Sequence, residues 1–196
     1  QPETAAKAFV KGEVANTDEA LQGARDIIAE RVNENERSRQ TVRRSFECTG
    51  MIRSKVVKGK EAEAGKFRDY FDWSEPLKCC TSHRLLAMRR GEAEGYLRVS
   101  ISPSDDDDCI SRVERGYVKA GTPAAAQVEM AIADAYKRLL KPSIETEFAG
   151  ASKGKADEEA IHVFANNLKQ LLLAAPLGQK RIMGIDPGFL NPFSSC

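Results

Sequence analysis

The fold is decided by two short stretches near the end of the chain, LLLAAP at residues 171–176 and RIMGIDPG at residues 181–188. The first is typical of the last turns of an apolar helix. It stops at Pro176 because proline lacks the N–H that would continue the helix. The second predicts a strand over 181–185 that delivers Asp186 onto a Pro-Gly turn. The chain therefore changes from helix to strand close to its end.

An acid at the end of a buried strand is how an RNase H-like domain begins. Such a domain needs on the order of 100 residues, and eight residues follow Gly188. We expect the chain to be a piece of a larger protein that stops just after a second domain starts. Asp186 alone is not expected to hold a metal ion, because two-metal chemistry needs several converging carboxylates.

The composition is that of an ordinary globular protein. Of the 196 residues, 41% are hydrophobic and 30% are charged, which is usual for soluble domains. No apolar run reaches the roughly 18 residues that cross a bilayer, and no secretory signal is present. We therefore expect a cytoplasmic protein without a membrane partner. The five cysteines lack the spacing of zinc ligands, so we expect reduced thiols and neither a metal nor a cofactor.

Hydrophobic spacing predicts a mostly helical chain with a small insert. One expected helix begins at Thr17. The others cover residues 36–47, 66–71, 83–92, 122–141 and 143–175. Two strands, over 50–57 and 96–101, are expected to pair antiparallel. Val42 and Phe46 are expected to be buried. A glycine costs about 1 kcal/mol inside a helix, so Gly150 and Gly154 favour a kink in the last helix.

The fold class is therefore mainly α. It combines a multi-helical region, a small α+β insert with a two-stranded antiparallel pair, one long C-terminal helix and the first strand of a truncated RNase H-like domain. The expected divisions are a helical region over 1–48, the insert over 49–104, a helical region with the long helix over 105–178, and the start of the RNase H-like domain over 179–196.

Positive charge is concentrated between Arg37 and Lys60. Eight basic residues and one acid, Glu47, lie in this window, a net charge of +7 in a chain whose total is +1. Bases along a helix and the following strand can follow a phosphate backbone without reading its sequence. The candidate nucleic-acid-binding residues are Arg37, Arg39, Arg43, Arg44, Lys55, Lys58 and Lys60. The alternative is a solvated face whose bases pair with acids of the same chain.

The order of five motifs resembles the Tex family of bacterial transcription accessory proteins. The motifs are Lys58-Gly59-Lys60-Glu61, KFRDYFD at 66–72, Ser82-His83-Arg84, residues 171–181 and IDPG at 185–188. The resemblance extends over residues from about 24 to 188. The tail over 189–196 and the glycine-rich stretch over 149–155 depart from the family pattern.

The resemblance implies a cytoplasmic, multidomain, nucleic-acid-binding protein that is associated with transcription. In the family a helical region precedes an RNase H-like domain of the YqgF type, helix-hairpin-helix motifs and an S1 domain. This chain resembles the later part of the helical region. The S1 domain, a major nucleic-acid contact of the family, is not within it.

Two functions follow as expectations. The first is a helical scaffold that binds RNA or DNA without sequence specificity through the seven basic residues. The alternative is a structural or interaction module that braces the YqgF-type and S1 domains or docks RNA polymerase or other transcription components. An enzyme is not expected and no catalytic residue is assigned. Clustering of the bases on one solvent-facing surface favours binding, whereas pairing with acids favours bracing. The RNA or DNA preference and the oligomeric state stay open.

Overall fold

The computed structural model describes residues 1–12, 14–175, 178 and 183. The strand predicted over 181–185, Asp186 and the tail over 189–196 lie outside the described residues. The chain divides into two compact units, Gln1–Ile161 and His162–Cys196, and the division falls inside the last helix.

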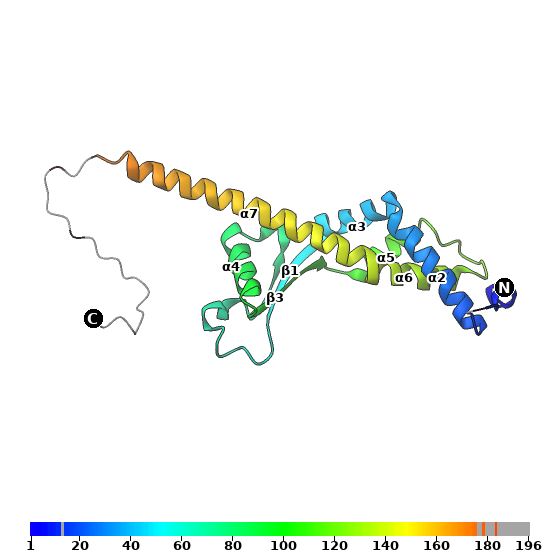
Figure 1. Cartoon of the computed structure of the whole chain (residues 1–196). Helices are drawn as coiled ribbons and strands as arrows, with labels where there is room; N and C mark the ends of the chain where they lie inside the picture. Colours follow the sequence, from blue (N-terminus) through cyan, green and yellow to red (C-terminus); the bar gives the residue numbers. More distant parts are fainter. Residues whose placement is uncertain (13, 176–177, 179–182, 184–196) are drawn as a thin grey trace. The chain divides into compact units, whose positions relative to one another are not determined.

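The described residues form a mainly α structure with one small antiparallel sheet and one long C-terminal helix, as predicted (Figure 1). Its elements are α1 (Pro2–Ala6), η1 (Lys7–Phe9), α2 (Thr17–Glu34), α3 (Glu36–Thr49), β1 (Gly50–Val56), η2 (Gly65–Tyr70), β2 (Asp72–Pro76), η3 (Leu77–Cys79), α4 (Ser82–Ala93), β3 (Leu97–Pro103), α5 (Asp106–Glu114), α6 (Ala125–Asp134), η4 (Ala135–Leu140) and α7 (Lys141–Leu172). The η4 segment is a π-helix and the other η segments are 3₁₀-helices.

The sheet has three strands rather than the predicted pair. Its order is β2-β1-β3, and β1 is antiparallel to both neighbours. The prediction missed β2 because this strand is five residues long and contains Pro76. An edge strand tolerates proline because one side of its backbone needs no partner in the sheet.

One face of the sheet packs against α4. Leu85 and Met88 of α4 are buried in the same apolar core as Ile52 of β1 and Ile101 of β3. Alternation along β1 places Arg53 and Lys55 on the opposite face. The packing of α4 against the sheet therefore leaves basic side chains of β1 on the face away from this core.

The helical core is built around α3 and the continuous run of α6, η4 and α7. Val42 and Phe46 of α3 are buried as predicted, and the ring of Phe46 lies 5.3 Å from the ring of Phe148 on α7. Gly150 and Gly154 do not interrupt α7, which continues to Leu172. The predicted kink is therefore absent from the described helix, because two isolated glycines weaken a helix without breaking its hydrogen bonds.

The sequence also predicts a break at Pro142, and the structure has none. The helix passes through this position by way of the π-helical segment η4. The N–H of Lys141 donates to the carbonyl of Tyr136, five residues back. Proline removes a donor and crowds the carbonyl four residues before it, and the wider turn that precedes Pro142 accommodates both effects.

Candidate nucleic-acid interface

Helix α3 positions four of the seven predicted binding residues. Its first turn is capped by Asn35, whose Oδ1 accepts from the N–H of Arg37 at 2.9 Å and from that of Ser38 at 3.3 Å. Because Val42 and Phe46 turn toward the core, the arginines occupy the remaining faces. Arg37 and Arg44 are exposed, and neither forms an ion pair within the described part of the chain.

Arg39 and Arg43 are instead engaged within the protein. The guanidinium of Arg39 donates to Ser143 Oγ of α7 at 3.0 Å. Arg43 Nε lies 3.0 Å from Glu147 Oε1 of the same helix, and its Nη1 lies 3.1 Å from Glu36 Oε1. The hydrogen bond to Glu147 raises the pKa of Arg43, against the effect of its burial. These two arginines connect α3 to α7, so their donors are largely occupied.

The three predicted lysines lie on β1 and the turn that follows it. Lys55 and Lys58 are exposed, whereas Lys60 is half-buried. The ammonium of Lys60 donates to the carbonyl of Gly95 at 3.0 Å and lies 5.7 Å from the centroid of the Tyr96 ring. Lys55 pairs across the sheet with Arg98 of β3, a basic residue outside the predicted set.

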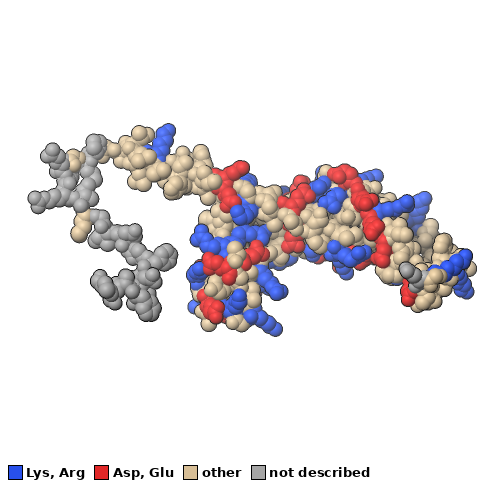
Figure 2. Space-filling model, viewed as in Figure 1, with Lys and Arg blue, Asp and Glu red and all other residues tan. Residues whose placement is uncertain are grey.

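The structure therefore separates the seven residues into exposed and engaged groups. Arg37, Arg44, Lys55 and Lys58 are exposed, and the other three contact side chains or carbonyls of the protein. In Figure 2, acidic groups lie among the basic ones on the face that is shown. Three of the seven basic residues are thus used in contacts within the protein, and four remain exposed.

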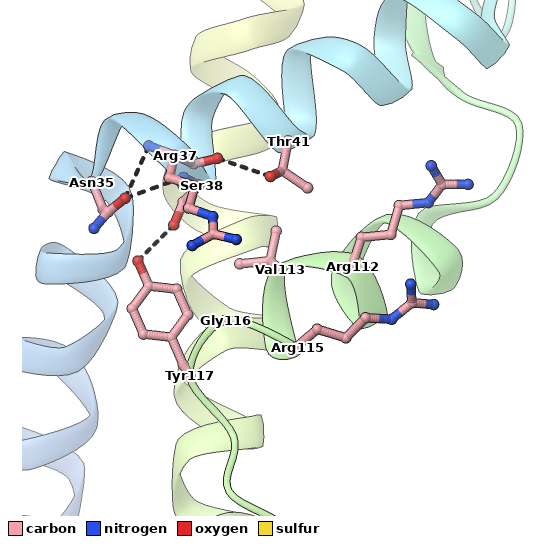
Figure 3. Close-up of a pocket in the computed structure, with 9 residues that line it drawn as sticks. All are labelled: Asn35, Arg37, Ser38, Thr41, Arg112, Val113, Arg115, Gly116 and Tyr117. Atoms are coloured by element: carbon pink, nitrogen blue, oxygen red, sulfur yellow. Dashed lines mark hydrogen bonds between the residues drawn. The ribbon is translucent and has the colours of Figure 1, made fainter.

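A cleft of about 350 Å³ lies between the first turns of α3 and the end of α5 (Figure 3). Its lining residues are Asn35, Arg37, Ser38, Thr41, Arg112, Val113, Arg115, Gly116 and Tyr117. Three of these are arginines and none is an acid. Arg37 was among the predicted binding residues, and Arg112 and Arg115 were not.

Hydrogen bonds order the walls of this cleft. Ser38 Oγ and the hydroxyl of Tyr117 share a bond of 2.7 Å, and Thr41 Oγ1 donates to the carbonyl of Arg37 at 2.8 Å. Figure 3 shows Arg112 and Arg115 extending side by side from α5. Arg112 forms an ion pair with Asp108 at 2.8 Å, and the hydrogen bond between them raises the pKa of Arg112. Arg115 forms no ion pair within the described residues.

Helix α5 begins at a run of four aspartates, residues 105–108. Asp105 Oδ1 accepts from the N–H of Asp107 at 2.9 Å and from that of Asp108 at 3.2 Å. Acidic residues are favourable at this end of a helix and basic ones at the other. Helix α5 thus has acidic residues at its start and basic residues at its end. The basic end, with Arg112 and Arg115, borders the cleft.

Two cysteines, Cys80 and Cys109, lie in partly or fully buried surroundings. Cys109 is buried, and burial raises the pKa of its thiol. Burial likewise raises the pKa of Cys80 to about 12.

Within the described residues, no group of three or more His, Cys, Asp or Glu side chains is placed to hold a metal ion. No helix of that same part is long and apolar enough to cross a membrane.

Comparison with known proteins places these features in a family. Residues 1–164 match the family model described as Tex central region-like. The protein named Protein tex of Bordetella pertussis is 39% identical over 183 residues, which cover 86% of this chain and 23% of that protein. The Transcriptional accessory protein Tex of Neisseria gonorrhoeae is 36% identical over 194 residues, which cover 96% of this chain and 26% of that protein.

A eukaryotic protein is more distantly similar. The S1 RNA-binding domain-containing protein 1 of Pongo abelii is 28% identical over 179 residues, which cover 85% of this chain and 18% of that protein. The chain spans about a quarter of the length of the curated bacterial relatives that it matches. With a family model that matches residues 1–164 and bacterial relatives that are 36% to 39% identical, the chain belongs to the Tex central region-like family.

Proposed function

We propose that this chain is the central helical region of a cytoplasmic transcription accessory factor and that it binds RNA or DNA without reading sequence. Its role is binding rather than catalysis. The names of the relatives, which refer to transcription and to an S1 RNA-binding domain, support a factor that works on nucleic acid. The contact is made by exposed arginine and lysine side chains of α3, β1 and the following turn.

The observation that carries the proposal is the availability of Arg37, Arg44, Lys55 and Lys58. All four are exposed, and none forms an ion pair within the part of the chain that the structure describes. An unpaired guanidinium or ammonium group can approach a phosphate and release its condensed counterions. Since these contacts involve phosphates and not base edges, they fix position without specifying sequence.

Fluorescence anisotropy with labelled 20-nucleotide RNA and single-stranded DNA tests this proposal. A triple variant, Arg44→Ala with Lys55→Ala and Lys58→Ala, removes three of the four bases. We expect it to weaken binding at least tenfold at 50 mM salt. The plot of log affinity against log salt should also become less steep, by about 0.7 for each lost contact to a single strand.

The matched control removes the same charge from other exposed bases. Arg90, Lys119 and Lys137 are exposed and form no side-chain hydrogen bond or ion pair within the described residues, so their triple alanine variant should bind within twofold of the parent chain. Equal weakening by both triple variants would reduce the effect to net charge. Unchanged binding by the first variant would contradict the proposed contact.

The second candidate function is bracing, and a specific observation favours it. Arg43 bonds to Glu147 and Arg39 bonds to Ser143, and both partners belong to α7. These contacts hold α3 against α7 as a structural module would require, whether that module supports neighbouring domains or docks RNA polymerase. A chain that unfolds cooperatively and binds neither oligonucleotide at 50 mM salt would support this function in place of nucleic-acid binding.

A further inference from the structure

We propose that the cleft between α3 and α5 is a phosphate-binding site and that it takes one phosphate of a single-stranded nucleic-acid backbone. The choice of ligand rests on the proposed function. The site itself rests on the composition of the cleft, which is lined by Arg37 of α3, Arg112 of α5 and Arg115 at the C-cap of α5. The proposed site therefore includes two arginines, Arg112 and Arg115, that lie outside the basic segment over 37–60.

The charge of the cleft is unbalanced. Three arginines line it and no aspartate or glutamate does. Asp108 bonds to Arg112 at 2.8 Å, and Arg37 and Arg115 form no ion pair within the described residues. Like charges that share one cleft repel each other, and a bound anion relieves that repulsion. Guanidinium groups also match the oxygens of a phosphate through paired N–H donors.

The position of Arg37 distinguishes a binding site from simple helix stabilisation. Basic residues at the end of α5 are favoured by the helix dipole, which accounts for Arg112 and Arg115 without any ligand. Arg37 is the second residue of α3, where the positive end of the dipole disfavours a cation. Its location is unfavourable for the helix alone and favourable for an anion held between the two helices.

Neutral donors complete the site. Ser38 and Tyr117 share one hydrogen bond, so one of the two hydroxyls keeps its hydrogen for an outside acceptor. Asn35 uses its Oδ1 to cap α3, which leaves its amide N–H donors available. Thr41 donates to the carbonyl of Arg37 and contributes no free donor. The cleft thus offers charged and neutral donors to the oxygens of one phosphate.

The size and form of the cleft support a phosphate that is part of a chain. Its volume of about 350 Å³ exceeds what one phosphate group fills and leaves space for an attached sugar. The arginines lie on exposed parts of α3 and α5, so a strand can enter and leave. Contacts of this kind position a backbone and do not read its bases.

The test compares two charge-matched double variants of the whole 196-residue chain. Arg37→Ala with Arg115→Ala alters the cleft, and Arg90→Ala with Lys137→Ala removes equal charge elsewhere. Anisotropy with a labelled 12-nucleotide single-stranded DNA should show at least fivefold weaker binding for the cleft variant and less than twofold for the control. Circular dichroism should give both variants the thermal midpoint of the parent, because none of the four side chains makes a side-chain bond within the described residues.

A second arm uses inorganic phosphate and does not depend on oligonucleotide binding. In ¹H–¹⁵N spectra, the Nε–H signals of Arg37, Arg112 and Arg115 should shift together on phosphate titration, and that of Arg90 should not. Absence of these shifts overturns the site. Shifts without any loss of oligonucleotide affinity in the cleft variant overturn the choice of ligand and favour a free phosphate or phosphorylated small molecule.

The outcomes also separate this inference from the proposed function. If the triple variant of Arg44, Lys55 and Lys58 loses affinity and the cleft variant does not, the proposed function stands and the cleft inference fails. If the parent chain binds no oligonucleotide, the proposed function fails together with the choice of ligand. The phosphate titration then decides whether the cleft is an anion site.

Discussion

The hydroxyl of Tyr136 donates a hydrogen bond of 2.6 Å to Oδ1 of Asp106. The other oxygen of the same carboxylate lies 2.5 Å from Lys141 Nζ. Burial, and next the bond to Asp106, raises the pKa of Tyr136, so its hydroxyl remains a protonated donor. One carboxylate at the start of α5 therefore holds the π-helical segment η4 and the first residue of α7.

Tyr136→Phe should destabilise the chain by about 1–2 kcal/mol, since it removes one hydrogen bond to a charged group and keeps the buried ring. The free energy of unfolding in urea measures the effect. Tyr70→Phe is the matched control, because the hydroxyl of Tyr70 makes no hydrogen bond within the described residues, and it should change stability by less than about 0.5 kcal/mol. Similar losses in both variants would contradict a specific role for the Tyr136 hydroxyl.

Asp106 should also make stability depend on pH. Burial by itself raises the pKa of this carboxyl, but the hydrogen bonds from Lys141 and Tyr136 prevail and lower it. A carboxyl whose pKa is lower in the folded state stabilises the fold above its unfolded pKa of about 3.9, and that stabilisation is lost as pH falls through the folded value. Asp106→Asn should therefore be less stable than the parent at pH 7, with a smaller difference at pH 3.

Urea unfolding at pH 7, 5 and 3 measures this difference. Because other carboxyls titrate in both proteins, the gap between parent and variant is the quantity that matters. Asp69→Asn serves as the control, since Asp69 is exposed and has no hydrogen-bond or ion-pair partner within the described residues. A gap that stays constant down to pH 3 would refute the role assigned to the ionised Asp106.

Two glycines in helices should respond to alanine in opposite directions. A Cβ at Gly91 of α4 would lie 2.6 Å from Leu97 Cδ1 and 3.2 Å from Phe67 Cδ1. Overpacking of a core costs about 1–3 kcal/mol, which exceeds the gain in helix propensity of about 1 kcal/mol. At Gly150 of α7 a Cβ meets nothing within 4 Å, so the gain is not opposed.

Thermal denaturation should therefore give a lower midpoint for Gly91→Ala and a higher one for Gly150→Ala. A change of 1 kcal/mol corresponds to about 2–4 °C in a chain of this size. A rise in the midpoint of Gly91→Ala would show that Leu97 yields without cost. It would then contradict the close packing of α4 against β3.

The contact between Arg43 and Glu147 should contribute a modest coupling energy. Arg43 keeps 23% of its side chain exposed and Glu147 keeps 46%, so solvent screens the pair. A double-mutant cycle with Arg43→Ala and Glu147→Gln should give about 0.5–1 kcal/mol. The value should fall in 1 M NaCl. A coupling near zero at low salt would remove the main support for a bracing role of α3.

Much of the helical fold was predictable because local patterns determine it. The spacing of Val42 and Phe46 predicted both α3 and its buried face. Strand β2 escaped prediction because its short, polar sequence becomes a strand only by pairing with β1. Pro142 predicted a break because its accommodation depends on the π-helical turn before it, which no local signal announces.

The candidate site was predictable only in part. Arg37 was found through its charge-rich neighbourhood. Arg112 and Arg115 were not, because Asp108 and Glu114 balance their charge in the sequence, and only the fold brings them to Arg37. Conversely, Arg39 and Arg43 looked equivalent to Arg37 in the sequence. Their partners Ser143 and Glu147 come from a distant segment, so the engagement of these arginines became visible only in three dimensions.

The π-helical segment η4 also keeps two packing surfaces in phase. Ile132, Tyr136, Leu140 and Ile144 are fully buried at steps of four residues, although four residues of an α-helix overshoot a full turn by about 40°. Left uncorrected, this drift would carry the inward row toward solvent within a few turns. The wider turn of η4 compensates for this rotational drift. If η4 wound as an α-helix with all its residues kept, everything downstream would rotate by about 100°, so that Ile144 would leave the interior and Glu147 would turn away from Arg43.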